Sequence, residues 1–182
     1  MNEEFQTFLS MLEVATSRIA GAYFQLPVSG ADSMYRERVY CYELYHQLRR
    51  ISGDFPFSFG GEVDKTGHPH FEDGQYARSK PDLLVHEPGS MNRNLAVVEV
   101  KRADANRGAM GRDLGKLAWF CDRAAYFGGV FLVYGEAGPP DVLERKIRNA
   151  ASEASTDMTC LTCLYHRSVG EPARRVLWRS PG

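Results

Sequence analysis

Apolar positions in the first part of the chain recur with a helical period. In the first 24 residues the repeating positions are Phe5, Phe8, Leu9, Leu12, Thr16 and Ile19. This spacing predicts one amphipathic helix over residues 1–24, because positions three and four apart share a helix face. Gly30 interrupts the pattern, and either Asp32 or Ser33 is suited to cap a second helix over Met34–Ile51.

Shorter runs rich in β-branched and aromatic residues follow, and such runs are typical of strands. They predict strands over Phe55–Val63, Asp82–His86, Leu95–Lys101 and Val130–Tyr134. The segment Asp64–Ser79 is charged and contains glycines, which indicates a loop or the exposed end of a hairpin.

Two further helices and two short strands complete the predicted elements. The helices are expected over Ala109–Phe127 and Asp141–Ala154, and the strands near Cys160–Tyr165 and Arg175–Trp178. The core order is helix, three strands, helix, strand. It predicts an α/β fold with a central mixed β-sheet flanked by helices, plus an extra N-terminal helix and a C-terminal helix with short strands. A length of 182 residues predicts a single domain over residues 1–182.

Composition narrows the possible classes of protein. With 43% hydrophobic and 25% charged residues, the chain is too apolar to be disordered throughout. The 22 basic and 23 acidic residues exclude a generally basic nucleic-acid binder but allow a local binding site. No apolar run approaches the roughly 20 residues of a membrane span. The acidic start, Met1-Asn2-Glu3-Glu4, is unlike a signal peptide, so we expect a cytoplasmic protein without membrane contact.

The strongest candidate for chemistry is the segment that runs from Pro81-Asp82 to Glu99-Val100-Lys101. Asp82 and Glu99 are expected side by side on paired strands, and Glu99 and Lys101 on one face of a strand. An exposed salt bridge is the simplest interpretation. The apolar run before Glu99, however, is typical of a strand covered on both faces. Burying these charges there costs several kcal/mol per ion unless they are partnered, which favours a functional site.

Two carboxylates beside a lysine suit a hard divalent cation, Mg²⁺ or Mn²⁺. Mg²⁺ takes one or two carboxylates together with waters and substrate phosphate oxygens. The cation lowers the pKa of a bound water. Lys101 is placed to orient or deprotonate that water, or to stabilise the transition state. Together these groups indicate phosphodiester hydrolysis.

The motif and the order of elements around it resemble the PD-(D/E)xK nuclease superfamily over about residues 34–134. The resemblance implies a restriction-endonuclease-like core, with Asp82 and Glu99 as metal ligands and Lys101 as the catalytic lysine. Many relatives add a glutamate from the preceding helix. Glu43 is the chosen match, as a further catalytic residue and metal ligand, and Glu37 is the weaker choice.

The helix after the motif departs from the family pattern. Some relatives carry a glutamine and a tyrosine there, whereas this chain has Asp113 and Lys116, so those roles do not transfer. The basic residues that follow the motif are candidates to track a phosphate backbone, with solvated helix faces as the alternative. These candidates are Arg102, Arg107, Arg112 and Lys116. Tyr35, Tyr40, Tyr42, Tyr45 and Tyr76 add aromatic side chains, and most of them are assigned to packing.

The leading hypothesis is a metal-dependent endonuclease that acts on DNA, in a setting such as restriction, defence or repair. A homodimer would suit cleavage of both strands of a duplex. The alternative of a different class is a nuclease-like fold that binds nucleic acid or serves in assembly without catalysis. Hydrolysis of another phosphate ester is a third possibility, since a similar site would perform it.

Overall fold

The computed structural model describes residues 1–61, 76, 79–90 and 92–176. The helices are α1 (Asn2–Ser17), α2 (Gly21–Phe24), α3 (Glu37–Ile51), α4 (Arg107–Arg123) and α5 (Pro140–Glu153). The strands are β1 (Leu26–Val28), β2 (Ala31–Met34), β3 (Ser58–Gly60), β4 (Leu83–His86), β5 (Asn94–Arg102), β6 (Gly128–Tyr134), β7 (Leu161–His166) and β8 (Arg174–Arg175).

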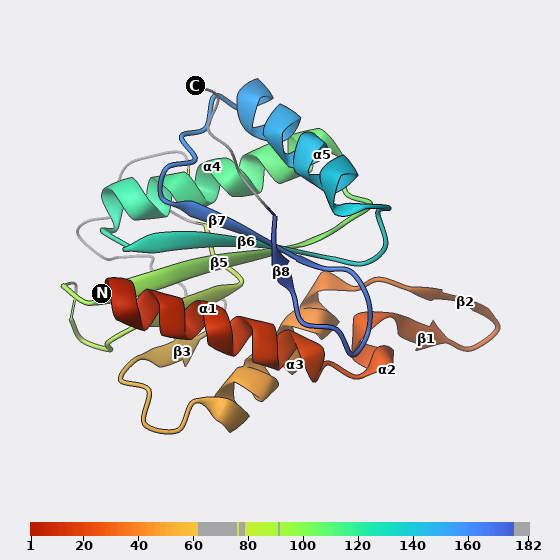
Figure 1. Ribbon diagram of the computed structural model, residues 1–182, viewed down its shortest axis with the longest axis horizontal. Coiled ribbons are helices and arrows are strands. Elements are labelled where there is room, and N and C mark those ends of the chain that lie inside the picture. The colour runs from red at the N-terminus through yellow and green to blue at the C-terminus, as the bar shows by residue number, and fades with distance from the viewer. Residues whose placement is uncertain (62–75, 77–78, 91, 177–182) are drawn as a thin grey trace.

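A six-stranded mixed sheet forms the centre of the molecule, in the order β3-β4-β5-β6-β7-β8 (Figure 1). The first three strands form an antiparallel meander, and β5, β6 and β7 run parallel. At the far edge β8 returns antiparallel to β7. The predicted α/β fold with a mixed sheet flanked by helices is therefore confirmed.

Helices cover both faces of this sheet, with α1 and α3 on one side and α4 and α5 on the other (Figure 1). Along β5, Val98 and Val100 pack into the core beneath α1 and α3, whereas Val97 packs against α4 and α5. Every residue from Asn94 to Val100 is buried, as expected for a strand covered on both faces. By the same alternation Glu99 shares the α4 side of the strand with Val97.

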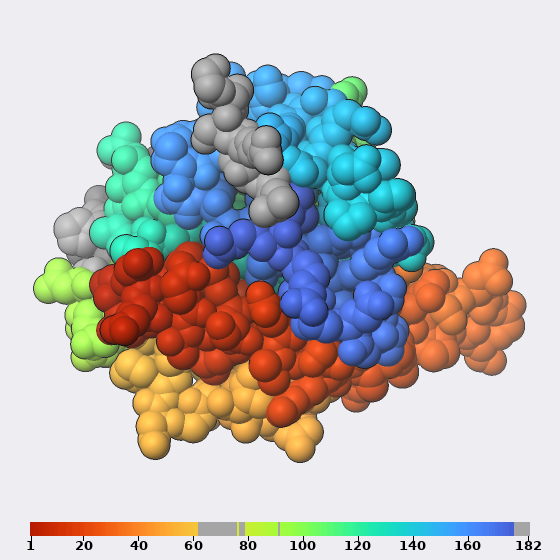
Figure 2. Space-filling view, viewed as in Figure 1, coloured from red at the N-terminus to blue at the C-terminus, as the bar shows by residue number. Residues whose placement is uncertain are grey.

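The prediction of one helix over residues 1–24 is wrong. Helix α1 ends at Ser17 and the short α2 follows separately, after which β1 and β2 pair as a hairpin. The break falls at residues 18–20, directly before Gly21, a residue that is unfavourable inside a helix. Gly30, with φ of +75°, supplies the left-handed position at the turn of the hairpin. Figure 2 shows this hairpin, in orange, projecting from the body of the molecule.

The predicted cap of the second helix is also wrong, because Asp32 and Ser33 belong to β2. Helix α3 instead begins after Arg36, whose side chain makes no capping hydrogen bond. Helix α4 starts two residues before its predicted start, since the Asn106 side chain accepts a hydrogen bond from Ala109 N at 2.8 Å. It ends before its predicted end, and Ala125 just beyond it has a left-handed φ of +51°.

Strand β3 occupies only the middle of the strand predicted over Phe55–Val63, and Val63 lies outside the described residues. Most of the loop predicted over Asp64–Ser79 also lies outside them, as does Trp178 of the last predicted strand. Within the described part of the chain, none of the helices has the length and apolarity needed to cross a membrane.

Candidate active site

The pairing of β4 with β5 brings Asp82 and Glu99 together. Leu83 pairs with Val98, so one further residue along the same antiparallel register sets Asp82 opposite Glu99. Asp82 Oδ2 accepts a hydrogen bond from Val100 N at 2.8 Å, which fixes the carboxylate against the strand. The two carboxylates therefore lie side by side, as the sequence predicts.

Glu99 is buried, with only 3% of its surface exposed. Its Oε2 lies 2.8 Å from Lys116 Nζ, while its Oε1 has no hydrogen-bond partner among the described residues. Burial raises the pKa of Glu99 well above its ordinary value, and the charge of Asp82 raises it further against the opposing effect of Lys116. Ionisation of Glu99 is thus unfavourable, and a second cation beside Oε1 would stabilise its carboxylate.

The Asp82 carboxyl also has a raised pKa. Burial is the main cause, and the charge of Asp113 adds to it. The hydrogen bond from Val100 N and the charges of Lys116 and Lys101 act in the opposite direction. Both carboxyls of the pair are therefore harder to ionise than carboxyls in water.

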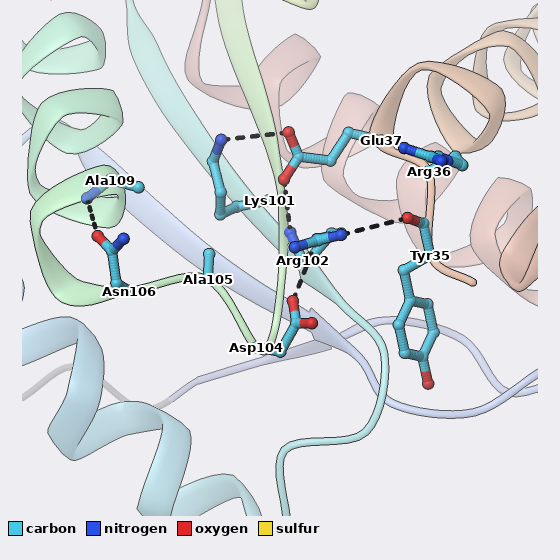
Figure 3. Close-up of a pocket in the computed structure, with 9 residues that line it drawn as sticks. All are labelled: Tyr35, Arg36, Glu37, Lys101, Arg102, Asp104, Ala105, Asn106 and Ala109. Carbon is cyan, nitrogen blue, oxygen red and sulfur yellow. Dashed lines mark hydrogen bonds and ion pairs between the residues drawn. The ribbon is translucent and has the colours of Figure 1, made fainter.

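Lys101, at the end of β5, lies between carboxylates from two helices on opposite faces of the sheet. Its Nζ is 2.7 Å from Asp113 Oδ2 of α4 and 3.3 Å from Glu37 Oε2 of α3. Figure 3 shows Glu37 and Lys101 pointing toward one another, with Glu37 also accepting a hydrogen bond from Arg102 N at 3.1 Å. Burial lowers the pKa of Lys101, but Asp113 and Glu37 outweigh it and the pKa is raised. Lys101 is consequently an ammonium at neutral pH.

Helix α4 supplies an acid and a base to the site. Asp113 and Lys116 are three residues apart and so share a helix face, with Asp113 Oδ1 3.8 Å from Lys116 Nζ. Each side chain is about one-seventh exposed. The sequence assigns Asp113 no role and predicts a phosphate-backbone contact for Lys116, although an acid and a base three residues apart beside the motif are visible in it.

The glutamate from α3 at the site is Glu37 rather than Glu43. Six residues separate them, so their side chains point about 120° apart around the helix axis. Glu37 faces Lys101, whereas Glu43 Oε1 accepts a hydrogen bond from Gln47 Nε2, one turn further along α3. The structure therefore brings Asp82, Glu99 and Lys101 together. The glutamate that α3 adds to them is Glu37, the weaker choice from the sequence, and not Glu43.

The four basic residues expected to contact nucleic acid lie in different settings. Lys116 is inside the site, paired with Glu99. Arg102 lies at its edge, with Nε 3.1 Å from Asp104, and the exposed Arg107 lies 3.1 Å from a glutamate of α5. Arg112 is exposed and makes no ion pair with another described residue. Lys116 thus differs from the other three because it forms an ion pair with a buried carboxylate.

Two hollows adjoin the site and share the Glu37 side chain in their walls. The arginine hollow has a volume of about 500 Å³, and its lining includes Tyr35, Arg36, Glu37, Lys101, Arg102 and Asp104 (Figure 3). The tyrosine hollow, of about 670 Å³, is lined by Glu37, Arg38, Cys41, Tyr42, Tyr45 and Asp82. Both volumes are within the range of about 300–1,000 Å³ that is usual for ligand pockets.

The donor set suits a hydrated divalent cation rather than an all-protein metal cage. Among the described residues, no three His, Cys, Asp or Glu side chains are grouped so that they could hold a metal ion. Mg²⁺ needs only one or two carboxylates, since waters and phosphate oxygens complete its shell. Asp82 and Glu99 provide this pair, and Glu99 Oε1 is a buried oxygen with no described hydrogen-bond partner. These two residues fit such an ion.

Comparison of the chain with protein-family models, with curated proteins and with solved structures found no match.

Proposed function

We propose that the chain is a metal-dependent nuclease that hydrolyses phosphodiester bonds, with DNA as the expected substrate. The observation that carries the proposal is the pair formed by the half-buried Asp82 and the buried Glu99, beside the ammonium of Lys101. Adjacent carboxyls that are withdrawn from water and have raised pKa values are unfavourable unless a cation accompanies them. A site with this arrangement is suited to bind a divalent cation and a phosphate together.

The arrangement of the elements supports the same proposal. The order α3, β3, β4, β5, α4, β6 follows the order expected from the resemblance to PD-(D/E)xK nucleases. Asp82 precedes β4, while Glu99 and Lys101 lie near the end of β5, which are the positions the resemblance implies. A restriction-endonuclease-like core is accordingly part of the proposal.

The charges of the site favour a divalent cation. When all groups are ionised, the carboxylates of Glu37, Asp82, Glu99 and Asp113 exceed the ammonium groups of Lys101 and Lys116 by two charges. Asp82 and Glu99 would hold Mg²⁺ or Mn²⁺, which supplies a bound water of lowered pKa and neutralises charge on the phosphate.

In the proposed site Lys101 acts as a charged donor. Its raised pKa keeps the proton on Nζ, so it donates hydrogen bonds to a phosphate oxygen and stabilises charge that develops in the transition state. Asp113 and Glu37 orient the ammonium from two sides. Lys116 opposes the protonation of Glu99.

A binding or assembly module without catalysis is the second candidate. The ion pairs Lys116–Glu99 and Lys101–Asp113 tie α4 to β5 without any metal, which is what a purely structural cluster would do. Such a module would not bind a divalent cation through Asp82 and Glu99. Metal binding therefore separates the two candidates.

The test compares wild type with Asp82→Asn, Glu99→Gln and Lys101→Met on plasmid, single-stranded and branched DNA. We expect cleavage by wild type in Mg²⁺ or Mn²⁺ and no cleavage in EDTA. Cleavage by each of the three variants should be slower than wild type by at least about 100-fold. The exposed Arg174→Ala is the matched surface control. Calorimetric titration with Mn²⁺ should show binding that the first two variants lose. Absence of cleavage by wild type, or equal cleavage by all variants, would reject the nuclease.

A further inference from the structure

Helix α3 presents two tyrosine side chains beside the candidate active site. Tyr42 is 63% exposed and Tyr45 is 37% exposed, so neither is a core residue of the kind that Tyr40 represents on the same helix. Three positions separate them, and they therefore lie on one helix face. Packing, which the sequence predicts for most of the tyrosines, therefore does not account for these two exposed rings.

These rings line the tyrosine hollow together with groups of the site itself. Asp82, one of the paired carboxylates, and Glu37, which orients Lys101, both belong to its walls. Arg38 lies one turn before Tyr42 and completes the same stripe of α3. An occupant of this hollow would therefore lie directly beside the reacting phosphate.

We infer that the tyrosine hollow binds an unpaired nucleobase next to the scissile phosphate, so that the substrate is single-stranded or locally unpaired nucleic acid. This inference rests on the proposed nuclease function and adds the form of the substrate. Exposed aromatic side chains along a strand-binding groove stack successive bases regardless of sequence. A base paired within a duplex is already stacked on both sides and must leave the helix before it reaches such a ring.

The distribution of charge separates the two hollows by chemistry. The arginine hollow has three cations, Arg36, Lys101 and Arg102, against the carboxylates of Glu37 and Asp104, and this excess of one positive charge suits the anionic backbone. The tyrosine hollow has the carboxylates of Glu37 and Asp82 against Arg38, and this excess of one negative charge disfavours a phosphate but tolerates a neutral base. Because both hollows share Glu37, one nucleotide unit could place its phosphate at Lys101 and its base on the tyrosines.

The experiment measures binding and cleavage of three probes in Mg²⁺. They are a thymidine oligonucleotide, a strand of the same length with abasic sites, and a blunt duplex hairpin. Fluorescence anisotropy should show the thymidine strand bound about tenfold or more tightly than the abasic strand or the duplex. Equal binding of all three would overturn the inference.

Matched variants separate stacking from other effects. Tyr42→Ala/Tyr45→Ala should weaken binding of the thymidine strand about tenfold or more and leave the abasic strand unaffected. Tyr42→Phe/Tyr45→Phe retains the rings and should bind as wild type. Tyr23→Ala removes a tyrosine of similar exposure from α2 and is the control. Unchanged binding by the double alanine variant would also overturn the inference.

Cleavage of the same probes distinguishes failure of this inference from failure of the nuclease proposal. If wild type cuts the duplex and the single strand equally and the alanine variant cuts like wild type, the base site is rejected and the nuclease stands. If no probe is cut while the thymidine strand still binds through the tyrosines, the nuclease is rejected and the base site stands. Neither cutting nor binding would reject both.

Discussion

Lys116 Nζ lies 2.8 Å from Glu99 Oε2, so α4 places an ammonium against a buried carboxylate of β5. This pair joins the helix that follows the motif to the strand that carries it. Lys116 also lies near Asp113, which in turn contacts Lys101. The two lysines and their carboxylates thus form one connected cluster in which each charge depends on its neighbours.

Replacing Lys116 should destabilise the protein through Glu99. Lys116→Met leaves a buried carboxylate without its cation, which raises the pKa of Glu99 further and costs up to about 3 kcal/mol of unfolding free energy. Urea denaturation at pH 7 in EDTA measures the loss. Arg112→Met, an exposed change on the same helix, should alter stability by no more than about 0.5 kcal/mol.

The double variant Glu99→Gln/Lys116→Met provides the internal check. With no charge left to compensate, it should recover most of the stability that Lys116→Met loses. If the double variant is as unstable as Lys116→Met, the effect comes from lost packing of the lysine stem and not from the uncompensated carboxylate.

The stability of the metal-free protein should depend on pH through Glu99. Its folded pKa is raised above the ordinary 4.5, so the folded state binds more protons than the unfolded state over that interval. Protonation of Glu99 therefore adds to the free energy of unfolding below pH 4.5, and this addition is lost as pH rises through the folded pKa. Glu99→Gln should therefore gain stability relative to wild type as pH increases from 4.5.

Denaturation curves of both proteins at a series of pH values in EDTA test this sign, with the exposed Glu3→Gln as control. Addition of Mg²⁺ should stabilise wild type near pH 7 and leave Glu99→Gln unchanged, because ligand binding to the folded state adds to its stability. A difference between wild type and Glu99→Gln that stays constant with pH would contradict a raised pKa.

Two replacements of Asp82 should differ in stability in the absence of metal. Asp82→Asn keeps an oxygen that accepts the hydrogen bond from Val100 N. It also removes the negative charge that opposes ionisation of Glu99. Asp82→Ala leaves the amide of Val100 without this acceptor, at a cost of about 1–2 kcal/mol. In EDTA the asparagine variant should be at least as stable as wild type and the alanine variant less stable. Equal stabilities would show that the hydrogen bond contributes nothing.

The sheet and the motif could be predicted because their patterns are local. The apolar run before Glu99 marks a buried strand, and the short distance in sequence between Asp82 and Glu99 favours pairing of adjacent strands. The hairpin at β1 and β2 could not be predicted from hydrophobicity, since most of its residues are exposed. Its strands are short and mostly exposed, so in the sequence Gly30 resembles a simple break between helices.

The choice between Glu37 and Glu43 depends on tertiary structure. Both precede the motif on one helix, and the rotation of that helix against the sheet decides which of them faces Lys101. Burial of Tyr40 and Leu44 fixes this rotation, and Glu37 at the start of α3 reaches the end of β5. The pairing of Asp113 with Lys101 likewise depends on how α4 crosses β5, which no local pattern specifies.

His166 should make the protein sensitive to acid, independently of the candidate site. The ring is fully buried and its Nδ1 lies 2.8 Å from the Tyr40 hydroxyl. Burial lowers its pKa from 6.5 to about 4, so the unfolded state binds more protons between these values. The stabilising contribution is complete above pH 6.5 and falls by about 3 kcal/mol as pH decreases to 4.

His166→Gln should remove this part of the pH dependence, whereas His46→Gln, an exposed change on α3, should retain it. Parallel stability curves for wild type and His166→Gln across this interval would contradict the assignment.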